Sequence, residues 1–479
     1  MPKKEDSKGI TVKKEEDMPN WYSQVILKAE LADYTPIKGC MVIRPYGYAI
    51  WQYIMDFFNG RLKRLKVQNA YFPMFIPESF FKKEAEHAKG FKPEVAWIQN
   101  KDEDSNERLA LRPTSETIMY FFYAKWIRSY RDLPYRINQW CNIVRWEVSD
   151  VKLFLRSREF LWQEGHCVYE TEEECRTETL MFLEEYRRVA EELLSIPVIM
   201  GMKTAREKFA GAKSTYTIEA FMPDGKSLQL GTSHELGQGF AKAFDIQFLG
   251  KDEQKHFPWQ NSWGISTRLI GACVMMHSDN KGLVLPPRIA SIKVVIVPIF
   301  YEKDKELILN ACMDIKKSLK IETELDDREG YTPGWKFNDW ELKGVPIRLE
   351  LGPKDLEKNQ VVLVRRDTGE KQSVKILELT KRVDEVLNAI QENLFFKAKK
   401  VLDDNIVETH IWEEFKEFIR QKKLVKTVFC GDIICEEQIK EETGGATSRC
   451  IPFNSEKPKD SCVHCGKKAL YEVYFSKNY

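Results

Sequence analysis

The segment from Arg145 to His166 combines residue types that rarely share one strand. Its second half alternates charged, aromatic and imidazole side chains, at Arg158, Phe160, Trp162, Glu164 and His166. Successive side chains of a β-strand point to opposite faces, so these five are expected on one face. Because ions resist burial unless paired, that face is either a salt-bridged, exposed surface or, as we predict, a polar, aromatic-walled pocket for a small charged ligand.

Arginines around this strand predict that the ligand carries phosphate. Arg145 and Glu147 lie two apart, and Arg156 and Arg268 add cations close to aromatic residues. A cation beside a carboxylate is often only a structural ion pair, but guanidinium groups also match phosphate oxygens bidentately. The sequence contains neither GxxxxGK[ST] nor GxGxxG. We therefore expect arginines, with Phe160 stacked on a base, to hold any nucleotide.

The elements that position these residues fall into several domains, as 479 residues predict. Residues 1–20 are charged, lack the apolar run of a secretory signal, and are predicted to form a flexible leader. A catalytic part is expected over 21–288. The continuous apolar run SIKVVIVPIF then begins a βαβ-type domain over 289–398. The last part, 399–479, holds five cysteines.

Hydrophobic periodicity places elements around the opening strand. We expect helices over 48–66, 174–195, 304–319 and 376–404, strands near 214–221, 227–232 and 257–263, and a helix with Ile265, Leu269, Ala272 and Met276 on one side.

Composition excludes some function classes. Lys+Arg total 74 and Asp+Glu 73, so any nucleic-acid surface must be a local patch. No run of about 18 apolar residues occurs, so no membrane-spanning helix is expected. Six of the 11 cysteines are scattered, which fits a reducing cytoplasm.

The remaining cysteines have the spacing of a structural zinc site. Cys430-x4-Cys435 and Cys462-x2-Cys465 form two short chelating loops, and Cys450 is the odd one. Disulfides are the alternative, and His464 inside the second loop is a weaker candidate ligand.

Together these residues resemble a known family. Arg145-x-Glu147 with Arg156 and Phe160 resembles motif 2 of the class II aminoacyl-tRNA synthetases, WGISTR resembles motif 3, and the helix before NAYFPMFIP resembles motif 1. Motif 3 has Gly264-Ile265-Ser266 where the class pattern has two glycines. Within the class, prolyl-tRNA synthetases are resembled by LRPTSE, FLWQEGH, QLGTSHELGQ, HSDNKGLVLPPRIA and PGWKFNDWELKGVPIRLELGPKD, from about residue 20 to 479.

The resemblance implies an α+β catalytic domain with an antiparallel sheet and flanking helices. It also implies an α/β anticodon-binding domain and a small α/β zinc-binding C-terminal domain. The implied reaction activates L-proline with ATP and Mg²⁺ and transfers it to tRNA(Pro), in a cytoplasmic homodimer without membrane contact. No editing domain separates Arg145 from Arg268, so misactivation of alanine or cysteine is expected.

The resemblance also implies residue roles. Arg145 and Arg268 are the catalytic cations. ATP is expected at Arg145, Glu147, Arg156, Phe160, Gln229, Thr232 and Arg268. Proline is expected at Thr114, Glu116, Arg145, Trp162, Glu164, His166, His234, Ser266 and the 91–94 loop. Anticodon guanines are expected at Glu341, Arg348 and Asp355, and zinc at Cys430, Cys435, Cys462 and Cys465.

Simpler structural explanations stay open for some of these residues. Thr114 and Glu116 can be a helix-capping pair, His166 a satisfied core histidine, and His234 a loop residue.

Two other classes of protein are also considered. One is a synthetase-like paralogue without aminoacylation, and the other is a threonyl or seryl enzyme. The resemblance also implies that the terminal carboxylate, on Tyr479, reaches toward the active site.

Overall fold

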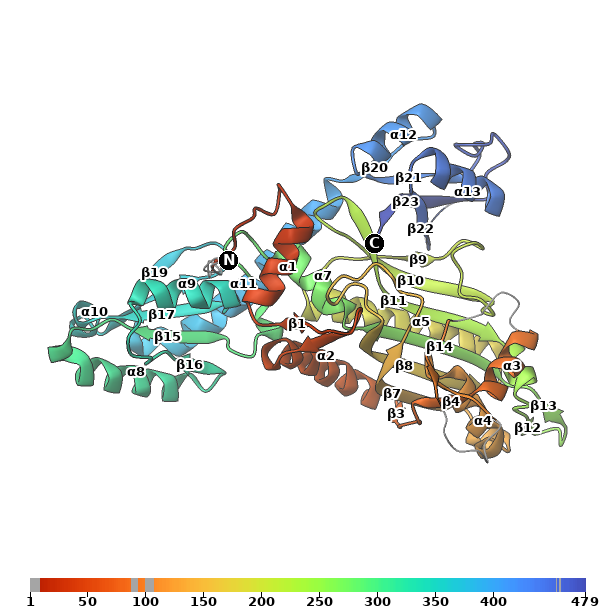
Figure 1. Cartoon of the computed structure of the whole chain (residues 1–479), viewed down its shortest axis with the longest axis horizontal. Coiled ribbons are helices and arrows are strands. Elements are labelled where there is room, and N and C mark those ends of the chain that lie inside the picture. Colours follow the sequence, from red (N-terminus) through yellow and green to blue (C-terminus); the bar gives the residue numbers. More distant parts are fainter. Residues whose placement is uncertain (1–8, 88–93, 100–106, 454, 456–457) are drawn as a thin grey trace.

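The computed structural model describes residues 9–87, 94–99, 107–453, 455 and 458–479 (Figure 1). Its main feature is an 11-stranded sheet that runs through both the catalytic and the C-terminal parts. Adjacent strands are antiparallel except at the two ends of the sheet. The order is β20 (Ile406–Glu408), β21 (Leu424–Phe429), β23 (Tyr471–Asn478), β22 (Thr447–Pro452), β9 (Ile199–Met202), β10 (Ser214–Phe221), β11 (Lys226–Gly237), β14 (Trp259–Ser266), β8 (Glu159–Tyr169), β7 (Tyr135–Val144) and β3 (Gln68–Asn69).

One face of the catalytic strands is covered by helices. The covering helices are α1 (Met18–Lys28), α2 (Pro45–Arg64), α5 (Glu172–Arg188) and α7 (Arg268–His277). Phe182 of α5 stacks on Trp263 of β14 with ring centroids 4.0 Å apart. Because side chains alternate along a strand, the neighbours of Trp263 point to the opposite, open face. That open face carries the candidate site.

Helix α5 begins where a capping box predicts. Thr171 and Glu174 bond each other's backbone N–H groups, and this satisfies donors that the first helical turn leaves free. The predicted span of 174–195 is met by α5 followed by a wider turn over Val189–Leu193. At the other predicted helix Ile265 belongs to β14, and α7 starts only at Arg268.

Smaller elements surround the sheet. Helix α4 (Glu116–Trp126) starts at the open face, and α3 (Glu78–His87) packs beside it. The rest are β1 (Ala32–Tyr34), β2 (Met41–Ile43), β4 (Phe75–Pro77), β5 (Trp97–Ile98), β6 (Leu109–Leu111), α6 (Gly239–Ala243), β12 (Phe248–Leu249) and β13 (Lys255–His256). From residue 145 to residue 268 the chain contains only such sheet strands and short helices. No inserted editing domain is present in this fully described stretch.

The start of the chain differs from the predicted leader of residues 1–20. Lys14 donates to the carbonyl of Ser278 at 2.9 Å, and Ile10 and Val12 pack against the catalytic core. Helix α1 already starts at Met18. The described part of this segment, residues 9–20, is therefore part of the catalytic domain.

The part predicted to bind the anticodon, residues 289–398, contains an α/β unit. Its sheet has the order β16 (Thr323–Leu325), β15 (Val294–Pro298), β17 (Ile347–Leu351), β18 (Gln360–Arg365) and β19 (Lys371–Lys375). Helices α8 (Lys305–Leu319), α9 (Pro333–Lys343) and α10 (Pro353–Glu357) connect these strands. The β16–β15–β17 pairs are parallel, as expected for βαβ units.

A long helix links the three parts. α11 (Leu379–Asp403) packs Ile390 into the anticodon-domain core, Ala398 into the catalytic core and Leu402 against Leu424 of β21. The predicted boundary at 398/399 therefore lies inside a helix. The C-terminal part adds α12 (Trp412–Arg420) and α13 (Ile433–Glu442) to β20–β23. No helix of the described residues has the length and apolarity to cross a membrane.

Candidate active site and cysteine cluster

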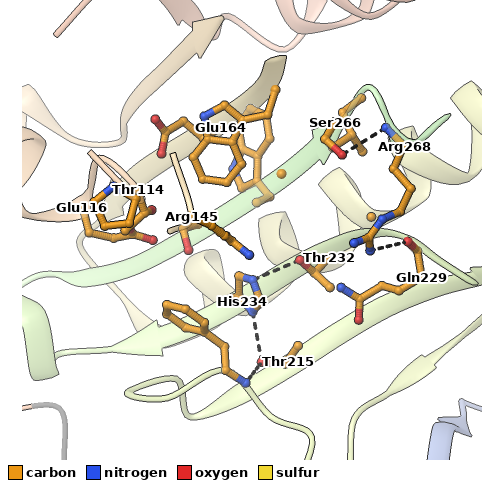
Figure 2. Close-up of a pocket in the computed structure, with 18 of the residues that line it drawn as sticks. Thr114, Glu116, Arg145, Glu164, Thr215, Gln229, Thr232, His234, Ser266 and Arg268 are labelled. Carbon is orange, nitrogen blue, oxygen red and sulfur yellow. Dashed lines mark hydrogen bonds between the residues drawn. The ribbon is translucent and has the colours of Figure 1, made fainter. Parts of the chain in front are cut away.

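The open face of the sheet holds a cavity of about 600 Å³. Its floor is formed by alternate residues of β8, β10, β11 and β14, since Glu164 faces Gly264 and Gly264 faces Thr232 across the strand pairs. The predicted residues that line it are Thr114, Glu116, Arg145, Glu147, Phe160, Trp162, Glu164, His166, Gln229, Thr232, His234, Ser266 and Arg268. Figure 2 shows Thr114 and Glu116 at one side, Gln229 and Arg268 at the other, and Arg145 and His234 between.

A hydrogen-bonded carboxylate cluster builds the first end. The Thr114 hydroxyl donates to Glu116, the first residue of α4. Ser115, and not Thr114, is the N-cap residue, and it makes no side-chain capping bond. Thr114 and Glu116 are therefore not a capping pair. Both side chains are buried, with Glu116 only 5% exposed, yet both line the cavity.

Glu164 locks this end in place. Its carboxylate accepts from the backbone N–H of Ser115 at 3.2 Å, from Gln139 Nε2 at 3.1 Å and from His166 Nε2 at 3.0 Å. The Tyr120 hydroxyl lies 3.1 Å from the other nitrogen of His166. Strands β7 and β8 and helix α4 thus meet at one carboxylate.

The protonation of this pair follows from burial and pairing. Burial lowers the pKa of His166, but its hydrogen bond to Glu164 and the charges of Glu116 and Glu164 outweigh that effect and raise it. Burial raises the pKa of Glu164, and the His166 bond and charge outweigh it and lower that pKa. Both shifts favour a carboxylate–imidazolium pair.

Gly165, between these two residues, is required by the packing behind them. A Cβ atom there would lie 2.1 Å from the Trp263 ring. The glycine lets the indole lie flat against β8, so the cavity residues on either side keep their register.

Arg145 spans the middle of the cavity. Its guanidinium lies 5.8 Å from the Phe160 ring centroid and 5.9 Å from that of Trp162. Within the described part of the chain the guanidinium donates no hydrogen bond to protein, and the residue is exposed. Its donors are therefore available to a ligand.

The second end is cationic. Arg268 donates from Nη1 to the carbonyl of Gln229 at 3.1 Å and from Nε to that of Leu155 at 3.2 Å. The Ser266 hydroxyl accepts from the backbone N–H of Arg268 at 3.2 Å. Burial and the neighbouring Arg145 lower the pKa of Arg268 to about 10, although the charge of Glu219 acts in the opposite direction.

His234 is neutral. Burial, with His166 and Arg145 nearby, lowers its pKa to about 3. Its ring nitrogens lie 3.0 Å from the Thr215 hydroxyl and 3.1 Å from the Thr232 hydroxyl. It is a strand residue of β11, so the alternative of a loop residue is wrong.

Two further predicted arginines lie off the cavity wall. Arg158 donates to the Val148 carbonyl at 2.9 Å and lies over Trp146, so it supports the loop after Arg145. Arg156 is exposed and is not among the lining residues, although its charge also lowers the pKa of Arg268. Of the predicted 91–94 loop, Glu94 lines the cavity and residues 91–93 lie outside the described residues.

Sequence reasoning missed several residues. Gln139 and Ser115 hold Glu164, and Thr215, Glu207, Phe209 and Ser262 line the cavity. Thr215 pairs with His234 across β10–β11, and Ser262 pairs with His234 across β11–β14. The signal was the alternation of polar residues in two neighbouring strands, which is informative only once the strand pairing is known.

The three predicted anticodon residues lie on α9, β17 and α10. Arg348 donates to Glu341 at 3.1 Å and to Glu350 at 2.9 Å, above the Phe337 ring. Asp355 accepts from Gln360 at 3.3 Å. Among the described residues, no hydrogen bond joins Asp355 to Glu341 or Arg348, so the structure brings two of the three together.

The four predicted cysteines converge in the C-terminal part. The Sγ atoms of Cys430 and Cys465 lie 3.6 Å apart, those of Cys435 and Cys462 lie 3.9 Å apart, and all four lie within 4.8 Å of one another. A tetrahedral zinc ion with Zn–S distances of about 2.3 Å requires sulfur separations of about 3.8 Å. All 11 cysteines carry free thiols, so the disulfide alternative is wrong.

The other two candidates in this region have different positions. Cys450 is buried on β22 and is not in the cluster. His464 Nδ1 lies 3.3 Å from the Cys435 sulfur, and its Nε2 lies 3.1 Å from Glu442. It contacts a cysteine of the cluster from outside.

Comparison with known proteins first defines the class. Residues 97–277 match the family model described as "tRNA synthetase class II core domain (G, H, P, S and T)", and 293–386 match "Anticodon binding domain". With the antiparallel sheet and its arginine-lined cavity, these matches define a class II aminoacyl-tRNA synthetase. Residues 412–479 match "Prolyl-tRNA synthetase, C-terminal".

Full-length relatives then define the family. The proline–tRNA ligase of Alkaliphilus oremlandii is 51% identical over 97% of this chain and 97% of its own length. Proline–tRNA ligase 2 of Clostridioides difficile is 51% identical over 98% and 97%, and the enzyme of Natranaerobius thermophilus 51% over 97% and 97%. The chain belongs to the prolyl-tRNA synthetase family.

Proposed function

We propose that this chain is a ligase that activates L-proline with ATP and then transfers the prolyl group to tRNA(Pro). One observation carries the proposal. A single cavity has a buried carboxylate cluster at one end, Arg268 at the other, and Arg145 between them. An amino acid and ATP must meet head to head in this way for the first step.

The chemistry of that step assigns a role to each end. An oxygen of the proline carboxylate bonds to the α-phosphorus of ATP, and the bond from that phosphorus to pyrophosphate breaks. Negative charge grows on the α-phosphate, so a fixed cation stabilises the transition state more than the ground state. Arg145 has that position, and Arg268, with Gln229 and Thr232, faces the outer phosphates and ribose. Magnesium enters with ATP.

Adenine is assigned to the aromatic wall. Phe160 offers a stacking surface with Arg145 nearby, and Glu147 at the rim can accept from the exocyclic amino group. Arg156 is proposed to approach the phosphates from outside the cavity.

Proline is assigned to the carboxylate end. Its secondary ammonium needs two acceptors, and Thr114 and Glu116 offer a hydroxyl oxygen and a carboxylate there. Trp162 and neutral His234 wall the ring, with Ser266 further along the cavity. Glu164 and His166 act on the substrate mainly by holding the N-terminus of α4.

Proline-dependent ATP–pyrophosphate exchange tests this function. We expect exchange with proline, none with threonine or serine, and charging of tRNA(Pro) at its 3′ end. Exchange that proline does not support would contradict the proposal. Exchange without tRNA charging would instead identify a paralogue that activates proline without aminoacylation.

The anticodon assignment rests on Arg348 and Glu341. An arginine donating to guanine O6 and N7 and a carboxylate accepting from its amino group are matched to guanine. Because the two residues are already paired, RNA must exchange that ion pair for contacts to a base. Arg348→Ala should reduce tRNA charging and leave pyrophosphate exchange unchanged.

The cysteine cluster is proposed to hold structural zinc. Its sulfur separations match a tetrahedral site, and no position is open for a substrate. Metal analysis of the purified protein should give one zinc per chain. Cys435→Ser should lose it, while Cys450→Ser should retain it.

A cytoplasmic homodimer is also proposed. The β1–β2 hairpin and the start of α2 expose apolar side chains, among them Tyr34 at 56%, Ile37 at 59% and Val42 at 51%. Exposed apolar surface of this kind is typical of interfaces, and this region contains the motif 1 helix. Eleven free thiols fit a reducing compartment. Light scattering should give twice the mass of one chain.

A further inference from the structure

The joint between the C-terminal and catalytic domains contains a buried ion triad. Glu219 of β10 is bonded to Lys203, which follows β9, and to Arg449 of β22. Lys203 Nζ lies 2.6 Å from Oε1, and Arg449 donates to Oε2 from Nη2 at 2.8 Å and from Nε at 3.1 Å. The three side chains are at most 5% exposed.

Each side chain of this triad, or the carboxylate it contacts, makes a further hydrogen bond. Thr217 donates to the same carboxylate at 3.0 Å, Lys203 donates to the Arg449 carbonyl at 2.9 Å, and Arg449 Nη1 donates to Thr447 at 2.9 Å. Buried charges are costly and contribute little net stability compared with apolar packing. We therefore consider the effect of the triad on the positions of the strands that carry it.

The geometry leads to the nucleotide end of the cavity. Glu219 pairs directly with Gln229 across β10–β11, after a one-residue shift in register. Residues opposite each other in an antiparallel pair share a face. Gln229 lines the cavity, and its carbonyl accepts from Arg268.

The C-terminal domain contacts the same strands a second time. The end of β23 pairs in parallel with the start of β11, at Lys226 and Ser227, and the Ser476 hydroxyl donates to that of Ser227 at 2.6 Å. Figure 1 shows these last strands beside β9 and β10. Gln229 thus lies opposite one contact from the C-terminal domain, at Glu219, and two residues after another, at Ser227.

We propose that Arg449 is a positioning residue for ATP. Through Glu219 it holds the part of β10–β11 that presents Gln229 and anchors Arg268, so the zinc-bearing domain is a structural part of the nucleotide end. The inference rests on the proposed function, since it takes Gln229 and Arg268 as ATP-binding residues.

Arg449→Met tests this with little risk of unfolding. The triad has two cations and one carboxylate, so removing Arg449 leaves the matched pair Lys203–Glu219. Loss of hydrogen bonds to a charged group predicts a KM for ATP raised about tenfold in pyrophosphate exchange, with the KM for proline within twofold of wild type. Arg449→Lys keeps the charge without the two-pronged bond and should give a smaller rise. The Arg449→Lys variant serves as the test if Arg449→Met does not fold.

A neighbouring variant is the matched control. Ser448 bonds Thr204 at 3.0 Å across the same joint and does not touch Glu219, so Ser448→Ala should leave both KM values unchanged. The inference is overturned if Arg449 variants leave the KM for ATP unchanged or raise both KM values equally. Arg268→Ala separates the two proposals. If it leaves the KM for ATP unchanged, the ATP assignment fails; if it acts while Arg449→Met does not, the inference alone fails.

Discussion

The two ends of the cavity are built on opposite principles. At the proposed proline end Glu116, Glu164 and His166 are at most 5% exposed. Glu164 bonds His166 and the backbone N–H of Ser115, and Glu116 accepts from Thr114. At the proposed nucleotide end Arg145 is exposed, and among the described residues the Arg268 guanidinium bonds only backbone carbonyls.

The difference follows from the substrates. A small zwitterion offers few contacts, so its recognition needs acceptors placed before it binds, which lowers the cost of ordering them. A triphosphate brings its own charge and pairs with donors left free for it. Mutations at the proposed proline end should therefore change the KM for proline, whereas loss of Arg145 should lower the rate of the chemical step.

Arg145→Ala should have the largest effect, because it removes the cation nearest the developing charge. Losing such a contact costs about 2–5 kcal/mol, or about a 30- to 5,000-fold lower rate of pyrophosphate exchange. Arg382→Ala, on α11 and outside the cavity, is the control and should match wild type. A loss of less than tenfold would place the catalytic cation elsewhere.

Alanine and cysteine test how selective the preformed end is. A pocket can discriminate against an amino acid by only about 10- to 200-fold for each methylene that it lacks relative to proline. No editing domain lies between residues 145 and 268. Both amino acids should therefore support measurable exchange, and mischarged tRNA should persist with the pure protein. Complete rejection in exchange would show that the cavity alone discriminates fully, and rapid deacylation would show a second, hydrolytic site.

Glu116→Gln should act on affinity alone. A hydrogen bond to a charged group contributes about 1.5–3 kcal/mol, so the KM for proline should rise about ten- to a hundredfold while the KM for ATP stays the same. Glu173→Gln, exposed on α5, is the control. Equal changes in both KM values would mean that the two ends are coupled.

The smallest expected effect is the pH dependence of the stability that His166 contributes. Since the pKa of folded His166 is raised, the stability that its pairing contributes is full below its ordinary pKa of 6.5. That contribution falls as pH rises through the raised value. The melting-temperature difference between wild type and His166→Gln should therefore shrink above pH 6.5. A difference that grows with pH would show that His166 is held neutral.

Some features of the fold and the site could be predicted from the sequence, and others could not. The alternation of Arg158, Phe160, Trp162, Glu164 and His166 predicted one face of a strand. The last four share the cavity wall, but Arg158 precedes β8 and lies off that wall. The spacing of Cys430, Cys435, Cys462 and Cys465 predicted their convergence. Local rules are enough here, because strand alternation and short chelating loops are properties of neighbouring residues.

Long-range pairing could not be predicted in this way. Gln139, Ser115 and Thr215 belong to the site only because β7, α4 and β10 lie beside the strands that carry the recognised motifs. Arg156 is the opposite case. It occupies a position of motif 2, yet its side chain does not line the cavity.

The sequence by itself determined the class of fold and the family, because these depend on residue types at short, ordered spacings. Only the tertiary structure decided that residues 9–20 belong to the catalytic domain, that α11 crosses the predicted boundary, and that β22 extends the catalytic sheet. Such contacts join segments hundreds of residues apart. They depend on the complementarity of folded surfaces, which no local pattern encodes.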